Sequence, residues 1–313
     1  MKMIPIKKTI FRNRLITVGV IIIIIDFVLG VVGQFWQPYS PAQIFVSGLP
    51  PSTSHLLGTD NYGHDVFSVM LISTLPTLLV GIGVGILTTL ISSIIALLSG
   101  YYGYGRKGIL IDMATILALA IPGIILLIII GAYFASASKA FGYFGIVLTL
   151  SVTGWAWGAK TMRSQVLSLS NREYILASKL IGEKPWKIML DQLLPPIFPL
   201  VIGQFLFGTL YGILSLATAE FFGAIPVTTQ NLGTMMSLIS SSSAYLIGYW
   251  WWILGAILPI IIVAIGIGML MIGLDEITDP RLKKIRVRFR EPQISIPTDE
   301  KIILLNLPKE VEI

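Results

Sequence analysis

The sequence contains no cysteine and only two histidines, His55 and His64, among its 313 residues. The absence of cysteine excludes disulfides, thiolate–metal sites and cysteine nucleophiles in this chain. Charged residues are also scarce, at 12% of the chain, against roughly 25% in a typical soluble domain. Hydrophobic residues make up 55%, and the mean hydropathy is +0.84. This composition indicates an integral membrane protein.

Motifs for ATP chemistry are missing as well. No G-x-x-x-x-G-K-[ST] pattern occurs, so the chain has no P-loop, and the glycine-rich stretch 102–108 is interpreted as a tight turn between two spans. The paired acids, metal-ligand spacings and nucleophile constellations of an enzyme site are also absent. We therefore expect neither enzymatic activity nor a cofactor in this chain. The net charge of +6 does not indicate nucleic acid, because basic residues of membrane proteins gather in cytoplasmic loops.

Six hydrophobic segments are long enough to cross a bilayer, which requires about 20 apolar residues in a helix. We expect each to be helical, because hydrocarbon offers the backbone no hydrogen-bonding partner. The predicted fold class is therefore an all-α integral membrane protein. The expected spans are 14–33, 76–101, 110–134, 142–161, 196–219 and 248–274. The expected regions are a tail and first span in 1–34, an external loop in 35–75, a core of five spans in 76–278 and a tail in 279–313.

The basic residues predict the orientation. Of the 22 lysines and arginines, 21 fall in the segments on one side of the predicted spans. Only Lys139 lies in a loop on the opposite side. The basic side of a membrane protein is normally cytoplasmic, so both termini are expected in the cytoplasm. The first apolar run follows basic residues, as in a signal peptide, but no A-x-A-like cleavage site follows it, so we expect an uncleaved span.

A polar segment, 170–195, lies on the predicted cytoplasmic side between two spans. Ser170 and Glu173 fit an S-x-x-E capping box, and Gly182 suits the left-handed residue that ends a helix. Pro185 suits the first turn of a second helix. The expected apolar face of that helix consists of Trp186, Met189, Leu190 and Leu193. We call this segment the knob, and interpret it either as an interfacial element on lipid headgroups or as a docking element for a cytoplasmic partner.

The residues of the knob resemble a known family. Glu173, Ala177 and Gly182, with Leu194-Pro195 following, resemble the EAA loop of ABC-transporter permease subunits. The broader resemblance is to the second, C-type membrane subunit of the dipeptide/oligopeptide permease family. Further matches, in order along the chain, are Leu57-Gly58-Thr59-Asp60 with Gly63 and Asp65-Val66, then Thr153-Gly154-Trp155, Arg163, Gln165-Val166-Leu167-Ser168-Leu169 and Asp279-Pro280-Arg281-Leu282.

The resemblance implies a type I ABC importer permease that forms half of a translocation pathway. The implied partners are a homologous second permease, two subunits that bind ATP and Mg, and an extracellular substrate-binding protein, with membrane lipid around the spans. The implied cargo is a peptide, with oligosaccharides or nickel as alternatives. The implied coupling residues are Glu173, Ala177, Ser178, Gly182, Glu183, Lys184, Trp186 and Lys187, and the implied external signature residues are Gly58, Thr59, Asp60, Gly63 and Asp65.

Three positions depart from the family pattern. The family commonly has arginine where His64 stands and histidine where Gln192 stands. The family's glutamate near the end of the fifth span falls at Leu216 here, and we expect Glu220, one turn later, to take its role.

Polar residues in the fifth predicted span mark a candidate path. Gln204, Tyr211, Ser215 and Thr218 share one helix face at spacings of seven, four and three. Polar side chains are costly against lipid, which favours a position along the pathway. The alternative is that these side chains hydrogen-bond to neighbouring helices, as serine and threonine often do in membranes.

Three other interpretations remain open at this stage. An ion-coupled secondary transporter would use acids within spans, for which the candidates are Asp26, Asp112 and Glu220. The acids and histidines of the external loop could bind a divalent cation, but turn formation and helix capping are the favoured roles, so no metal is expected. The tail 283–313 is interpreted either as a disordered basic segment or as a strand-like segment packed on a partner subunit or anionic lipid.

Overall fold

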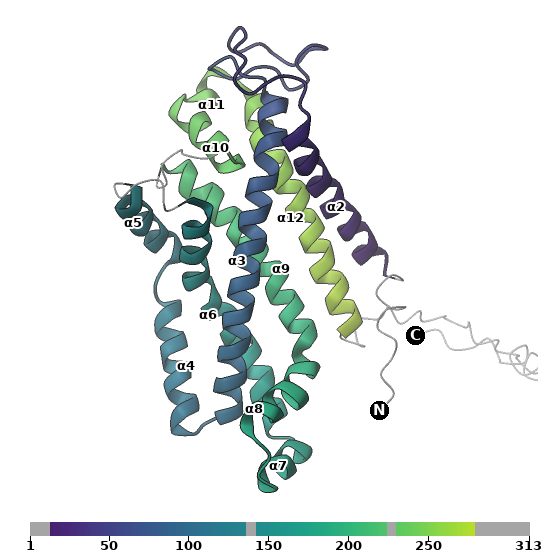
Figure 1. Cartoon of the computed structure of the whole chain (residues 1–313), viewed down its shortest axis with the longest axis vertical. Coiled ribbons are helices and arrows are strands. Elements are labelled where there is room, and N and C mark those ends of the chain that lie inside the picture. Colours follow the sequence, from purple (N-terminus) through teal and green to yellow (C-terminus); the bar gives the residue numbers. More distant parts are fainter. Residues whose placement is uncertain (1–12, 136–141, 224–229, 279–313) are drawn as a thin grey trace, which may run out of the picture.

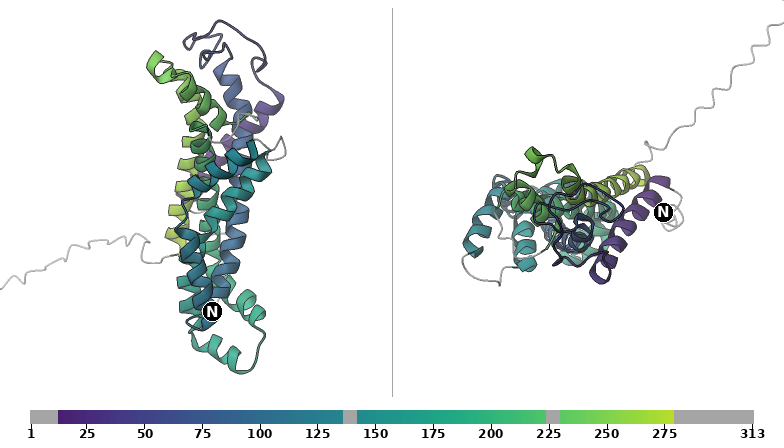
Figure 2. Two further views of the ribbon diagram at one scale, coloured as in Figure 1. Left: turned by 90° about the vertical axis from the view of Figure 1, so that its left-hand side faces the viewer. Right: turned by 90° about the horizontal axis from the view of Figure 1, so that it is seen from above.

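The computed structural model describes residues 13–135, 142–223 and 230–278. Long helices lie side by side along one axis, and shorter helices lie beside them and at the two ends (Figures 1 and 2). The long helices are α2 (Arg14–Phe35), α3 (Val66–Tyr102), α6 (Gly142–Ser170), α9 (Leu194–Phe221) and α12 (Trp250–Thr278). The remaining elements are α4 (Arg106–Leu119), α5 (Gly123–Ala135), α7 (Glu173–Leu180), α8 (Pro185–Lys187), the π-helix η1 (Ile188–Leu193), α10 (Leu232–Ser241) and α11 (Ala244–Ile247).

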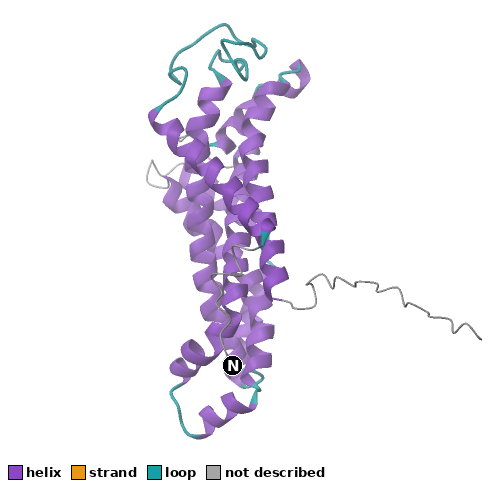
Figure 3. Cartoon of the chain, turned by 90° about the vertical axis from the view of Figure 1, so that its right-hand side faces the viewer, coloured by secondary structure: helices purple, strands orange, loops and turns teal. Residues whose placement is uncertain are grey.

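Helix α3 is the centre of the bundle and packs against α2, α6 and α9. The knob lies at one end of the bundle, which we call the knob end. The loop 36–65 covers the other end, which we call the loop end (Figure 1). Figure 3 shows that the described elements are helices joined by loops. The all-α fold class is therefore confirmed for the part of the chain that the structure describes.

Four helices in the described ranges are long and apolar enough to cross a membrane: Arg14–Phe35, Val66–Tyr102, Pro185–Phe221 and Trp250–Ile277. The predicted continuous span 110–134 is wrong, because α4 ends at Leu119 and α5 begins only at Gly123. Pro122 lies in the break, and a proline disfavours helical geometry in the residue before it. At 29 residues α6 is also long enough, but Lys160 and Arg163 make it less apolar than the other four.

The predicted boundaries at the loop end need two corrections. The expected loop 35–75 ends at Asp65, because α3 begins ten residues earlier than the predicted second span. The Asp65 carboxylate accepts a hydrogen bond from the Ser68 amide and caps α3. The segment between the predicted spans 196–219 and 248–274 contains the helix α10, which Asn231 and Thr234 begin with a reciprocal capping box. Side-chain caps of this kind replace the missing backbone partners of the first turn.

Pro76 lies inside α3 without ending it. Proline has no amide hydrogen, so the Ile72 carbonyl four residues earlier loses its helical partner. The Gln34 side chain on α2 fills this gap, because its Nε2 donates to the Ile72 carbonyl at 2.8 Å. The same pair of helices meets closely at Gly33, where an added Cβ would overlap the Leu71 backbone. These two contacts fix α2 against the central helix, as small residues and polar side chains commonly do between membrane helices.

Candidate functional site

The knob begins differently from the prediction. Ser170 is the last residue of α6, and its hydroxyl donates to the Gly100 carbonyl at 3.2 Å. The N-cap of α7 is Arg172, which makes no side-chain capping bond, and Glu173 is the first residue of the helix. The predicted capping box is therefore wrong. Its sequence pattern is present, but the serine is used to hold α6 against α3.

The end of α7 agrees with the prediction for Gly182. The φ angle of Gly182 is +78°, in the left-handed region. The Gly182 amide donates to the Lys179 carbonyl at 3.2 Å, and the Glu183 amide donates to the Ser178 carbonyl at 3.1 Å. This pair of bonds is a Schellman motif, which satisfies the last carbonyls of a helix and requires a left-handed residue. Pro185 then occupies the first turn of α8, as predicted.

The predicted apolar face of the second helix is confirmed in part. Leu193 is completely buried beside Ile188, and Met189 packs against them, whereas Trp186 and Leu190 are 57% and 49% exposed. The reason is that residues 188–193 form the π-helix η1. A π-helix aligns residues five apart rather than three or four apart. Ile188 and Leu193 therefore point together into a cluster that also contains Ile175 of α7.

Polar contacts join the two helices of the knob. The Gln192 amide group donates to Glu183 Oε2 at 2.7 Å and to the Ser178 hydroxyl at 3.0 Å. Glu183 also forms an ion pair with Lys187 at 3.2 Å. The Lys179 ammonium lies 4.6 Å from the centre of the Tyr101 ring of α3, and burial lowers its pKa. In the sequence, Gln192 stood out only as a departure from the family pattern. In the structure its hydrogen bonds connect η1 with α7 and with the turn that follows α7.

The exposed surface of the knob is apolar at its tip. Leu180 and Ile181 are 87% and 83% exposed, although they are large hydrophobic residues. We call these two residues the knob tip. Among the predicted coupling residues, Ser178 and Glu183 are half-buried by the contacts described above. The others are exposed: Glu173, Ala177, Gly182, Lys184, Trp186 and Lys187.

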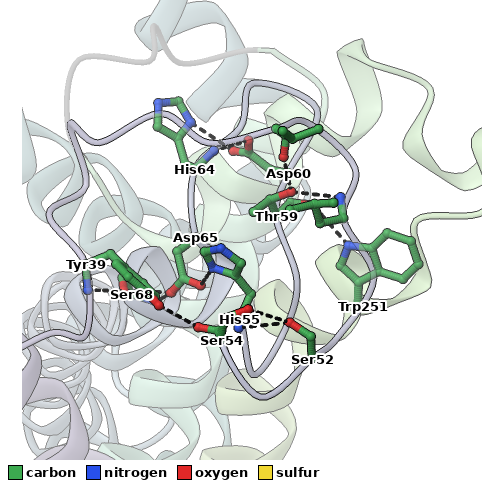
Figure 4. Close-up of polar contacts among 12 residues, drawn as sticks. Tyr39, Ser52, Ser54, His55, Thr59, Asp60, His64, Asp65, Ser68 and Trp251 are labelled. Carbon is green, nitrogen blue, oxygen red and sulfur yellow. Dashed lines mark hydrogen bonds and ion pairs between the residues drawn. The ribbon is translucent and has the colours of Figure 1, made fainter.

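The signature residues lie at the opposite end of the bundle, in a loop that several separate groups of hydrogen bonds hold in place (Figure 4). Asp60 accepts hydrogen bonds from the Tyr62 and His64 amides, both at 2.8 Å. The Thr59 hydroxyl donates to the Val46 carbonyl at 2.7 Å. Gly58 and Gly63 have φ angles of +63° and +86°, which explains their residue type. The favoured turn interpretation of this loop is thus supported by its geometry.

Asp65 joins this loop to α3. Its carboxylate accepts from the amide and the hydroxyl of Ser68, at 2.9 and 2.7 Å, and lies 2.9 Å from His55 Nδ1. His64 pairs instead with Asp60, at 3.1 Å. The described residues contain no cluster of three or more histidine, aspartate or glutamate side chains that could hold a metal ion.

Trp251 fixes the same loop to the start of α12. Its indole Nε1 donates to the Thr59 carbonyl at 3.1 Å. Trp251 and its neighbour Trp252 are 8% and 1% exposed, whereas Trp250 is 57% exposed. Of these three tryptophans, Trp250 alone has the exposed side chain expected of an aromatic residue at a membrane interface.

Two residues of the candidate pathway stripe, Gln204 and Tyr211, contact α6. Gln204 and Ser215 are buried, and the Tyr211 hydroxyl lies 3.1 Å from the Thr153 hydroxyl of α6. The Thr218 hydroxyl bonds within its own helix, to the Leu214 carbonyl. The contact of Tyr211 fits the interhelical alternative. The role of the stripe in transport stays a prediction.

The acids considered for ion coupling are far apart in the chain and have different surroundings. Asp112 of α4 binds Lys160 at 2.8 Å and lies 3.4 Å from Arg163 Nε, both on α6. Glu220 accepts a hydrogen bond from the Asn231 side chain at 2.9 Å, while Leu216 is packed among apolar residues. Asp26 is buried within α2. This arrangement gives no relay of neighbouring acids, which a proton path would need.

Comparison with known proteins agrees with this geometry. The family described as binding-protein-dependent transport system inner membrane component matches residues 89–284, more than half of the chain. The chain is 29% identical over 276 residues to the dipeptide transport system permease protein DppC of Bacillus subtilis, covering 87% of this chain and 84% of that protein. It is 27% identical over 275 residues to the oligopeptide transport system permease protein OppC of the same organism, covering 87% of each. It is 26% identical over 284 residues to the oligopeptide transport system permease protein OppC of Lactococcus lactis subsp. cremoris, covering 88% of this chain and 94% of that protein. The chain therefore belongs to the family of binding-protein-dependent transport system inner membrane components.

Proposed function

We propose that this chain is a permease subunit of an ATP-driven peptide importer, and that its knob docks on an ATP-binding subunit. Membership of the family makes the chain a multi-pass membrane component, not an enzyme. The names of the relatives, dipeptide and oligopeptide permease proteins, support a peptide cargo over oligosaccharides or nickel. The chain supplies a path and a mechanical connection, and ATP hydrolysis belongs to partner subunits.

The exposed knob tip is the observation that carries the docking proposal. Leu180 and Ile181 expose more than four-fifths of their surface to solvent. Large apolar side chains at the end of a polar element mark an interaction site. Exposed Lys184 and Glu173 lie on the same knob, so a partner surface can also recognise it by charge.

The structure of the knob suits a lever. From Pro185 to Phe221 the chain is helical without interruption, through α8, η1 and α9. Buried contacts of Ile175, Ile188 and Leu193 fix the knob to α3 and α6 through Leu97 and Val166. A displacement of the tip is therefore transmitted as a rigid-body movement to α9 and its neighbours. ATP-driven approach of two ATP-binding subunits would move the knobs of this chain and of a second permease between two states.

This proposal includes a definite orientation and set of partners. The knob end faces the cytoplasm, and the loop end, with Asp60 and Asp65, faces the extracellular substrate-binding protein. The assembly contains this chain, a homologous second permease and two ATP-binding subunits. Support for the orientation comes from the basic residues, which gather on the knob side of the predicted spans as they do in cytoplasmic loops.

Replacing Leu180 and Ile181 with glutamate tests the docking surface. Both side chains are exposed, so the fold should persist, while a buried charge in the interface should weaken binding of the ATP-binding subunit at least about tenfold. Co-purification of that subunit with the solubilised permease measures the effect. Tyr104→Glu is the matched control, because Tyr104 is 77% exposed in the short turn between α3 and α4. If all three variants retain the subunit equally, the knob tip is not the docking surface.

A further inference from the structure

The segment 230–233, at the start of α10, receives one polar contact from each of three long helices. The Tyr143 hydroxyl of α6 donates to the Gln230 carbonyl at 3.0 Å. The Leu232 amide donates to the Thr77 hydroxyl of α3 at 2.9 Å. The third contact comes from α9, through an acid. We call this segment the clasp, and α10 lies near the loop end of the bundle (Figure 1).

The acid is Glu220, in the last turn of α9. It is 1% exposed, and its Oε1 accepts a hydrogen bond from the Asn231 side chain at 2.9 Å. Oε2 has no hydrogen-bond partner among the described residues and lies against Gly233, where an added Cβ would overlap it. None of the ion pairs in the described part of the chain involves Glu220. Burial of a carboxyl group without a basic partner is costly, so stability alone does not explain an acid at this position.

The start of α10 makes this position tolerable for an acid. Asn231 uses both ends of its side chain, because its Oδ1 accepts from the Thr234 amide and caps α10, while its Nδ2 reaches Glu220. Amide groups at a helix N-terminus also favour a negative charge nearby. The Glu220 contact therefore requires α10 in this position, and it is lost when α9 and α10 separate. A contact of this kind suits a closure that forms in one state and breaks in another.

We infer that the clasp closes the loop end of the bundle in one of the two transport states, and that Glu220 is the positioning residue that holds it. The clasp joins α3, α6 and α9, so its contacts persist only while these helices keep one arrangement. Hydrogen bonds between membrane helices are individually weak, so three of them can hold a closed state and still break in each cycle. The inference rests on the proposed importer for its two states, and it adds which residues close the external end.

Two cysteines, Tyr143→Cys with Gln230→Cys, test the clasp in the assembled transporter in lipid vesicles. Gln230 is exposed and Tyr143 is half-buried, so a short, cleavable bifunctional thiol reagent can join them. Cross-linking should lower tri-alanine uptake at least about tenfold relative to the same variant before cross-linking, and cleavage of the reagent should restore uptake. Trapping ATP in the complex should lower the cross-link yield about fivefold, because the clasp is then open.

Each single-cysteine variant, treated with the same reagent, is the control and should keep its uptake. Normal uptake by the cross-linked complex would overturn the inference. An equal cross-link yield with and without trapped ATP would also overturn it.

Gly233→Ala tests the Glu220 contact without changing the acid. The added methyl group overlaps Oε2, so it should displace the carboxyl group and lower the cross-link yield of the resting complex about fivefold. Gly203→Ala is the matched control, because an added Cβ there meets no described atom within 4 Å. Glu220→Gln keeps an oxygen for Asn231 and should retain most of the yield, whereas Glu220→Ala should behave as Gly233→Ala does. Unchanged yields in both alanine variants would show that Glu220 does not hold the clasp.

The clasp and the docking proposal fail in different ways. Failure of the docking proposal would appear as equal retention of the ATP-binding subunit by the knob-tip variants and their control. Failure of the clasp would appear as a cross-link yield that does not respond to trapped ATP, in a complex that retains this subunit and hydrolyses ATP.

Discussion

Replacing Asp65 with alanine is expected to destabilise the loop end of the bundle by about 2–4 kcal/mol. The carboxylate caps α3 through the Ser68 amide and also accepts from the Ser68 hydroxyl. It lies against His55, which is 6% exposed. The alanine variant loses the cap and leaves two buried polar groups without their partner. Thermal unfolding in detergent and protease cleavage within residues 36–64 measure the loss.

Two further variants separate the cap from the charge. Asp65→Asn keeps an oxygen that can accept from the Ser68 amide, so it should retain part of the stability. Asp191→Ala removes an exposed acid at the knob end and should leave thermal unfolding unchanged. Equal melting temperatures for Asp65→Ala and Asp191→Ala would mean that the network around Asp65 contributes nothing to stability.

Most helices could be predicted because their sequences are continuously apolar. The observed α2 and α12 lie within two to four residues of the predicted spans 14–33 and 248–274. Gly182 and Pro185 could be placed because only a few residue types suit a left-handed helix end and a first helical turn. These features depend on local chemistry, which one sequence contains.

The errors arose where distant residues decide the local structure. Ser170 forms a capping pattern with Glu173 but bonds to Gly100, 70 residues earlier in the chain. The π-helix places Ile188 and Leu193 together, whereas the periodicity of an ordinary helix predicted that Trp186 and Leu190 would share a face with Leu193. The early start of α3 is a different case, because its cap, Asp65, is local and was among the acids expected to cap helices. The predicted span missed the first ten residues of α3 because they include serines and a threonine that are less apolar than the rest.

The pathway stripe shows a different limit. Sequence spacing correctly predicts that Gln204 and Tyr211 share a face of α9, but it does not predict which helix that face meets. In the structure Tyr211 and Gln204 lie against α6, at Thr153 and Gly158. Gln204 also lines a cavity whose wall is formed in part by α12, which follows much later in the chain. A shared helix face is therefore predictable, whereas the partner of that face is a property of the assembled bundle.

Replacing Gly182 with valine is expected to abolish transport while leaving ATP hydrolysis by the assembled complex in place. The φ angle of +78° is unfavourable for a β-branched residue, at a cost on the order of 1–2 kcal/mol. An added side chain meets no described atom within 4 Å, so the effect comes from the backbone alone. The variant should relax by unwinding the Schellman turn between α7 and α8, which changes the direction of the knob tip. Parallel measurements of peptide uptake and ATP hydrolysis in lipid vesicles check this result.

Gly182→Asn is the control that isolates the backbone effect. Asparagine tolerates the left-handed region far better than valine, and its side chain has the same open space around it. It should therefore retain most of the coupled transport, although its side chain is similar in size to that of valine. If both variants transport normally, the turn does not determine the position of the knob tip. If both lose transport equally, the side chain itself disturbs the partner surface, and the exposed face at Gly182 then belongs to the interface rather than to the lever.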